Sequence, residues 1–219
     1  MNQLIEGFKY IYAGATAPAA FFGRDGLPSV KTVAIAFFVG TFIIALLLFL
    51  TGLFSAQELQ IASDRLNQYM VVRGAALSVF HIPSPPARFL FPLQWAVYIL
   101  FAAGARHLTT VIFGEQGRSF GTMLLITVIA AAPLVLVAGL QGVFNNFFPM
   151  IPPVKSLTLL WSRIAFSVLL YLFSLLWEAF VFVTAARILF KQNYGRAILT
   201  WISPVVIGMS AFYLVLSLV

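Results

Sequence analysis

Cysteine is absent from all 219 residues, which excludes disulfide bonds, iron–sulfur clusters and thiol catalysis. Charge is scarce as well: 9% of residues are charged, against about 25% in soluble domains. The six acidic residues and two histidines, His81 and His107, show no metal-binding spacing. No phosphate-binding glycine loop and no Ser–His–acid spacing is present. We therefore expect a protein without cofactor or metal that is not an enzyme.

What the chain does contain is apolar sequence. Hydrophobic residues make up 62% of it, including 23 phenylalanines. A soluble domain of this size could not bury so much apolar surface, so the composition predicts an integral membrane protein. The length allows a single membrane domain over residues 1–219.

The net charge of +7 comes from thirteen Lys and Arg against six Asp and Glu. These basic residues are scattered near the ends of apolar runs rather than gathered in one patch. That distribution predicts contact with anionic lipid headgroups and argues against nucleic acid as a partner.

Five apolar runs are long enough to cross the ~30 Å hydrocarbon core as helices. The predicted spans lie at 32–53, 89–112, 120–144, 164–187 and 197–217. Pro133 interrupts the third run. Within a membrane a proline there predicts a kink, because neighbouring helices can re-satisfy the freed carbonyl. The fold class is therefore an all-α bundle of five transmembrane helices.

Two further segments have amphipathic spacing. Within residues 1–31, Leu4, Ile5 and Phe8 alternate with polar positions, which predicts a helix lying in the membrane interface. We interpret it as an anchor for the first span; the alternative is a docking helix for a partner. Residues 56–80, in the connection between the first two spans, predict a second interfacial helix. Asn145 and Asn146 are predicted to cap the third span.

The stretch from Gly114 to Gly142 (GEQGRSFGTMLLITVIAAAPLVLVAGLQG) carries a recognisable pattern. A helix, a Gly-bearing turn, a phenylalanine, an apolar helix and then a small residue before proline follow one another. The matching positions are Gly114, Gly117, Phe120, Ala132 and Pro133. In this layout the chain resembles the Yip1-domain family of polytopic membrane proteins. The resemblance implies five spans, a cytoplasmic N-terminus and no agreed enzymatic activity.

Orientation can be read from the basic residues beside the spans. With the N-terminus inside, basic residues such as Arg24, Lys31 and Arg187 fall on the cytoplasmic side in excess of those outside. This predicts an N-in, C-out topology. For so short a chain we expect the cytoplasmic (inner) membrane of a prokaryote, that is, its plasma membrane.

Candidate functional residues are few. Small residues at Ala102, Ala103, Gly104 and Ala132, with Pro133, predict faces where another helix packs closely. Glu178 lies near the middle of the fourth span, where a carboxylate must be protonated, paired or hydrated. It is a candidate ion or proton site, or half of an ion pair. Arg106 lies near the end of its span and is predicted to extend to the interface without a partner.

Together these features favour a non-enzymatic scaffold or accessory subunit. Its expected partners are lipids and other integral membrane subunits, or further copies of itself. The alternative is a small transporter or channel component that uses Glu178.

Overall fold

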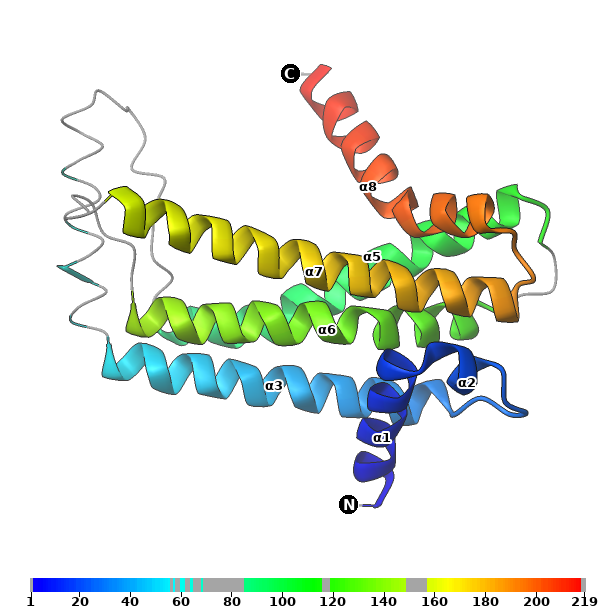
Figure 1. Cartoon of the computed structure of the whole chain (residues 1–219), viewed down its shortest axis with the longest axis horizontal. Coiled ribbons are helices and arrows are strands. Elements are labelled where there is room, and N and C mark those ends of the chain that lie inside the picture. Colours follow the sequence, from blue (N-terminus) through cyan, green and yellow to red (C-terminus); the bar gives the residue numbers. More distant parts are fainter. Residues whose placement is uncertain are drawn as a thin grey trace. The chain divides into compact units, whose positions relative to one another are not determined.

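The computed structural model describes residues 2–55, 57, 60–61, 64, 68, 85–115, 119–148 and 157–217. Within that part of the chain every regular element is a helix. In order these are α1 (Asn2–Thr16), α2 (Pro18–Phe22), α3 (Val30–Phe54), the 3-10 helix η1 (Pro85–Leu90), α5 (Phe91–Ile112), α6 (Phe120–Phe147), α7 (Leu157–Leu189) and α8 (Tyr194–Ser217) (Figure 1).

Five helices are long and apolar enough to cross a membrane, which confirms the prediction of five apolar spans. The qualifying segments are Val30–Phe54, Pro86–Ile112, Phe120–Phe147, Trp161–Leu189 and Tyr194–Phe212. They run a few residues past several predicted boundaries. These helices indicate an integral membrane protein.

The chain forms two compact units, which are described separately. Unit 1 contains Met1–Val39, Gln94–Leu134 and Leu175–Val219, whereas unit 2 contains Gly40–Leu93 and Val135–Ser174. Helices α3, α5, α6 and α7 therefore contribute residues to both units.

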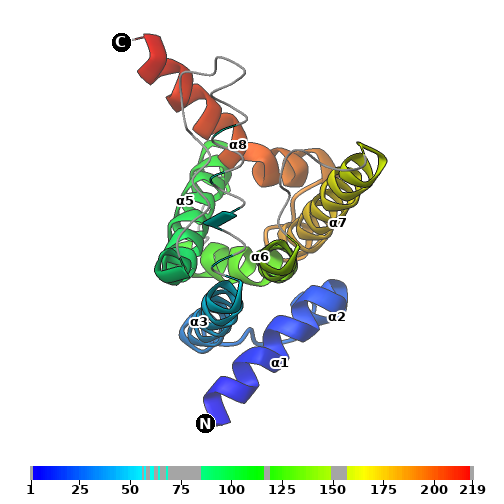
Figure 2. The same ribbon diagram turned by 90° about the vertical axis from the view of Figure 1, so that its left-hand side faces the viewer.

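In unit 1 the N-terminal segment is helical as predicted, but it breaks into two helices. Pro18 begins α2, where its missing N–H costs nothing, and Ala17 between the helices adopts a non-helical conformation. Helices α1 and α2 lie on one side of α6 and α8 lies on the other (Figure 2).

Helix α1 approaches its neighbours through glycine. A Cβ atom at Gly7 would lie 2.5 Å from the Ala36 Cβ and 2.6 Å from the Thr32 carbonyl oxygen of α3. A Cβ at Gly14 would lie 2.6 Å from Ile129 of α6. The bulky residues Ile5, Phe8 and Tyr12 are exposed instead. The placement of this helix in the membrane interface stays a prediction.

The predicted interfacial helix at 56–80 lies mostly outside the described residues; those that are described, such as Gln57 and Asp64, are helical. Gly117 of the family-like motif and His81 also lie outside them.

The turn after α5 is built as its sequence predicts. Gly114 has a φ of 75°, a left-handed conformation that glycine adopts without strain. Its N–H donates to the Val111 carbonyl (2.9 Å), and the Glu115 N–H donates to the Thr110 carbonyl (3.0 Å). This pair of bonds is a Schellman motif, which ends a helix. Ser119 then caps α6 by accepting from the Thr122 N–H at 3.1 Å.

In unit 2 the predicted capping role of Asn145 and Asn146 is wrong. Helix α6 continues to Phe147, and Asn146 is fully buried inside it. Its amide donates to the Leu48 carbonyl (3.1 Å) and the Thr51 hydroxyl (2.8 Å) of α3, and its oxygen accepts from Arg88 (2.9 Å). A buried amide needs hydrogen-bond partners, and α3 provides acceptors for the N–H groups of Asn146 where water does not reach.

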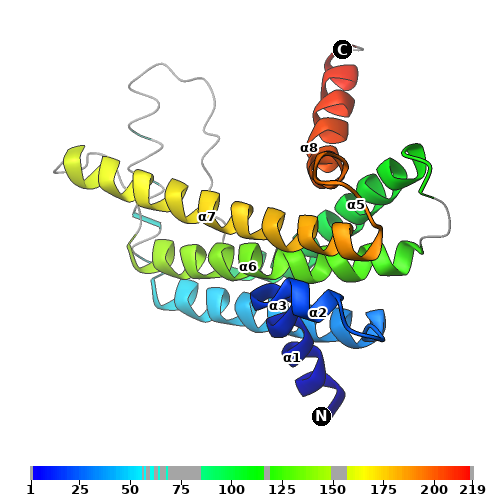
Figure 3. The ribbon, with the colours of Figure 1, turned by 45° about the vertical axis from the view of Figure 1, so that its right-hand side comes forward.

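Two helices contain proline. Helix α6 continues through Pro133, whereas α8, which contains Pro204, changes direction along its length (Figures 1 and 3). Proline removes one intrahelical hydrogen bond and pushes against the preceding turn, a local cause of bending that both helices contain.

Candidate functional site: a buried ion pair beside a membrane-facing pocket

The most unusual chemistry of unit 1 is an ion pair in the membrane-spanning part of the bundle. The Arg106 Nη2 of α5 lies 2.7 Å from the Glu178 Oε1 of α7, and each side chain is 2% exposed. Glu178 lies about 16 Å along α7 from its end at Leu189, at ~1.5 Å per residue. Two charges at such depth are tolerated because each neutralises the other.

Helical spacing brings Arg106 to this position. Tyr98, Ala102 and Arg106 are four residues apart, so they share one face of α5. Ala102 is fully buried on that face. Its small side chain lets the neighbouring helices approach, and the long Arg106 and Tyr98 side chains then meet Glu178 in the space on either side.

Further contacts hold the pair in place. The Tyr98 hydroxyl lies 3.0 Å and 3.2 Å from the two Glu178 carboxylate oxygens and donates to them. The Arg106 Nη1 donates to the Thr127 hydroxyl of α6 at 3.4 Å. The Arg106 guanidinium also lies 4.4 Å from the centre of the Phe182 ring, a favourable cation–π distance. The cluster therefore ties α5, α6 and α7 together.

Donors and acceptors in this cluster are unequal in number. Both Glu178 oxygens accept from partners within the chain. An arginine has five N–H donors, and its Nε is a buried atom without a hydrogen-bond partner. The site thus has an unused donor and an occupied carboxylate.

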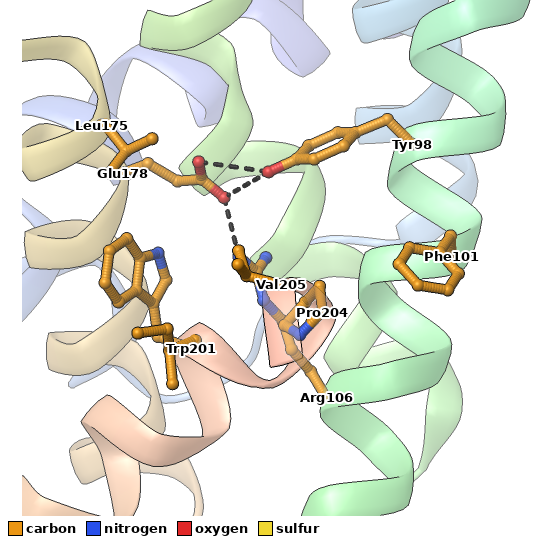
Figure 4. A pocket seen from close by; sticks show the side chains of 9 residues that line it. Tyr98, Phe101, Arg106, Leu175, Glu178, Trp201, Pro204 and Val205 are labelled. Carbon is orange, nitrogen blue, oxygen red and sulfur yellow. Dashed lines mark hydrogen bonds and ion pairs between the residues drawn. The ribbon is translucent and has the colours of Figure 1, made fainter. Parts of the chain in front are cut away.

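The cluster forms part of the wall of a pocket of about 180 Å³ between α5, α7 and α8. In Figure 4, Tyr98 from α5 and Glu178 from α7 point toward each other, and Arg106 reaches the carboxylate from another turn of α5. The remaining lining side chains are apolar or aromatic: Phe101, Leu175, Trp201, Ile202, Pro204 and Val205. Phe101, Leu175 and Val205 are exposed on the outside of the helices, so the pocket opens toward the lipid.

The structure corrects one sequence-based interpretation and resolves another. Arg106 does not extend to the interface, because it is buried and bound to Glu178. Glu178 is half of an ion pair, one of the roles considered for it. Arg106 lies four residues after Ala102 and therefore on the same face of the helix. A small residue on that face indicates close packing against another helix, and this spacing was the signal that Arg106 points inward.

Tyr98, Thr127 and Trp201 were not identified from sequence. A tyrosine, a threonine and a tryptophan are ordinary residues in membrane helices. Only the packing of α5, α6, α7 and α8 brings Tyr98 and Thr127 to the ion pair and Trp201 to the pocket.

The residues predicted for helix packing differ in their surroundings. Ala102, Ala103 and Ala132 are buried inside the chain itself. Gly104 is not a close-approach point, because a Cβ there would meet nothing within 4 Å. Pro133 is half-buried. The alanine faces are therefore occupied by contacts within this chain.

Among the described residues, no group of three or more His, Asp or Glu side chains could hold a metal ion. His107 packs edge-on against Phe120 with ring centres 5.7 Å apart.

No protein-family model matches the chain, and neither the curated proteins nor the solved structures contain a match. The functional argument consequently rests on the site itself.

Proposed function

We propose that this protein is a non-enzymatic scaffold or accessory subunit of the membrane, which packs against other integral membrane proteins or further copies of itself. The observation that supports this best is the closed Arg106–Glu178 pair. A carboxylate whose two oxygens already accept from an arginine and a tyrosine stabilises helix packing and has little capacity left for an ion.

The surface for a partner is then an apolar helix face rather than the buried alanines. In unit 2, α7 exposes Phe166, Leu169 and Leu172 at three-residue spacing, so they lie on one side of the helix. Large apolar side chains suit contact with another membrane helix by van der Waals packing.

The test is purification in mild detergent followed by native mass spectrometry. A scaffold should bring a defined set of subunits, and Leu169→Ala with Leu172→Ala should lower their occupancy. The matched control is Leu136→Ala with Leu140→Ala, which shortens two exposed leucines of α6 in the same unit. If the α7 variant retains every partner at wild-type stoichiometry, that face is not the docking surface.

Family membership is also proposed. The helix ending at Gly114, the capped start of α6 at Phe120 and the Ala132–Pro133 pair within α6 follow the layout of the Yip1-domain family. That layout supports an N-in, C-out topology, and we propose with it a location in a prokaryotic plasma membrane.

The second candidate is a small transporter or channel component. It is favoured by the pocket beside Glu178 and by the bend in α8, whose Pro204 lines that pocket. In proteoliposomes, Glu178→Gln should then abolish proton or cation flux while the protein still elutes as a folded species. Equal flux in the wild type and the variant would remove this candidate.

A further inference from the structure

We propose that the pocket between α5, α7 and α8 binds an uncharged, membrane-soluble amphiphile whose six-membered ring bears carbonyl oxygens, a quinone-type molecule. In this proposal the ring occupies the pocket, a carbonyl oxygen accepts from Arg106, and the apolar tail leaves toward the lipid. The binding site is independent of whether the protein acts as a scaffold.

The hydrogen-bonding groups of the pocket indicate the chemistry of the ligand's headgroup. Arg106 is one of the residues that line the pocket, and its Nε–H is a buried donor without a hydrogen-bond partner, which costs about 1–3 kcal/mol. The carboxylate of Glu178 is already engaged by Arg106 and Tyr98. An acceptor oxygen that reaches Arg106 would satisfy this donor, so the site favours a ligand with such an oxygen over a cation.

The charge balance of the pocket argues against an anionic ligand as well. The charges of Arg106 and Glu178 sum to zero, and among the described residues no further charged side chain lines the pocket. An anionic head would bring an unbalanced charge into the membrane interior, at a cost of several kcal/mol. A neutral carbonyl satisfies the spare donor without that cost.

The volume of the pocket and the side chains that line it indicate the structure of the rest of the ligand. The volume of about 180 Å³ is close to the ~150 Å³ of an apolar cavity known to hold benzene, so one ring fits. Aromatic side chains of Tyr98, Phe101 and Trp201 line the same space and can stack on a flat ring. The exposed rim at Phe101 and Val205 lets a tail pass sideways into the bilayer.

The experiment uses the full chain in phosphatidylcholine nanodiscs. The probe is a benzoquinone with a ten-carbon tail and a diazirine next to the ring, mapped after photolysis by peptide mass spectrometry. We expect saturable labelling within 201–205 or at Leu175, displaced by unlabelled decylbenzoquinone but not by decylbenzene.

Three variants complete the test. Val205→Phe, or Leu175→Phe if the first does not fold, should abolish the labelling by filling the pocket. Leu199→Phe, an equally exposed position of α8 that does not line the pocket, should leave it unchanged. Replacing both charges, Arg106→Gln with Glu178→Gln, should raise the half-saturating concentration about tenfold through loss of a charge-assisted hydrogen bond.

Labelling that rises linearly with probe, or that is equal in the wild type and the pocket-filling variant, would overturn the site. Displacement by decylbenzene as efficient as by decylbenzoquinone would overturn the carbonyl assignment.

Discussion

Arg106 shows how one residue can organise three helices. It binds Glu178 of α7, donates to Thr127 of α6 and lies over the ring of Phe182, all from α5. In a membrane interior such contacts carry more weight than at a surface, because no water competes for the charges. Removing either partner would leave the other charge uncompensated in an apolar environment.

We expect Arg106→Gln or Glu178→Gln alone to lower the free energy of unfolding by about 3–5 kcal/mol, the typical cost of breaking a buried pair. The double variant should lose less than the sum, because both charges are removed together. Denaturant titration in mixed micelles, followed by circular dichroism, measures these differences.

The control is Arg187→Gln, since Arg187 is exposed and its guanidinium lies over the Tyr194 ring. Its effect should stay within about 1 kcal/mol. Strictly additive losses in the Arg106 and Glu178 cycle would mean that the two charges do not stabilise each other.

At the scale of the element, small residues decide which helices touch. Gly7 and Gly14 are two turns apart on α1 and let it lie against α3 and α6. In unit 2, Gly139 and Gly142 of α6 do the same: a Cβ on either would lie 2.6 Å from Ile44 or Leu48 of α3. Gly104 is also a glycine within a helix, but a Cβ there would meet no atom within 4 Å.

Alanine substitution separates these two situations. Gly7→Ala or Gly14→Ala should destabilise the protein by about 1–3 kcal/mol, because the added methyl group has no room. Gly104→Ala should stabilise it by about 0.5–1 kcal/mol through higher helix propensity. Thermal unfolding in detergent compares the three, and a loss at Gly104 equal to that at Gly7 would contradict the packing described.

At the scale of the whole molecule, the proposed N-in topology predicts which helix ends a membrane-impermeant reagent can reach from outside the cell. In unit 1 the turn after α5 and the turn before α8 lie together, since Gln192 donates to the Glu115 carboxylate at 2.9 Å. Gly121, at the start of α6, lies near Val30, at the start of α3. Basic residues Arg24, Lys31, Arg187, Lys191 and Arg196 flank these same helix ends, as expected of a cytoplasmic side.

Because the natural sequence has no cysteine, single cysteines report this topology directly. Asp25→Cys should react with a membrane-impermeant maleimide only after the cells are opened. Asn145→Cys, exposed at the other end of α6, should react in intact cells. The reverse pattern would establish an N-out protein.

Composition and the lengths of the apolar runs determined the class of this protein. Twenty-three phenylalanines and five runs long enough to span a membrane leave an apolar helical bundle as the available solution. The turn at Gly114 was also readable, because a glycine that ends a helix acts through its own backbone neighbours. The cap at Ser119 was not identified from the sequence.

Partnerships between helices were decided only by the tertiary structure. Apolar side chains are nearly equivalent against lipid and against another helix, so periodicity within one span does not reveal its neighbours. Arg106 and Glu178 are 72 residues apart, and the sequence alone did not identify them as partners of each other. Asn146 was assigned to a cap for the same reason, since its partners Leu48 and Thr51 belong to a helix almost a hundred residues earlier. A buried polar group takes whichever partner the packing brings within reach, and that packing is a property of the assembled helices.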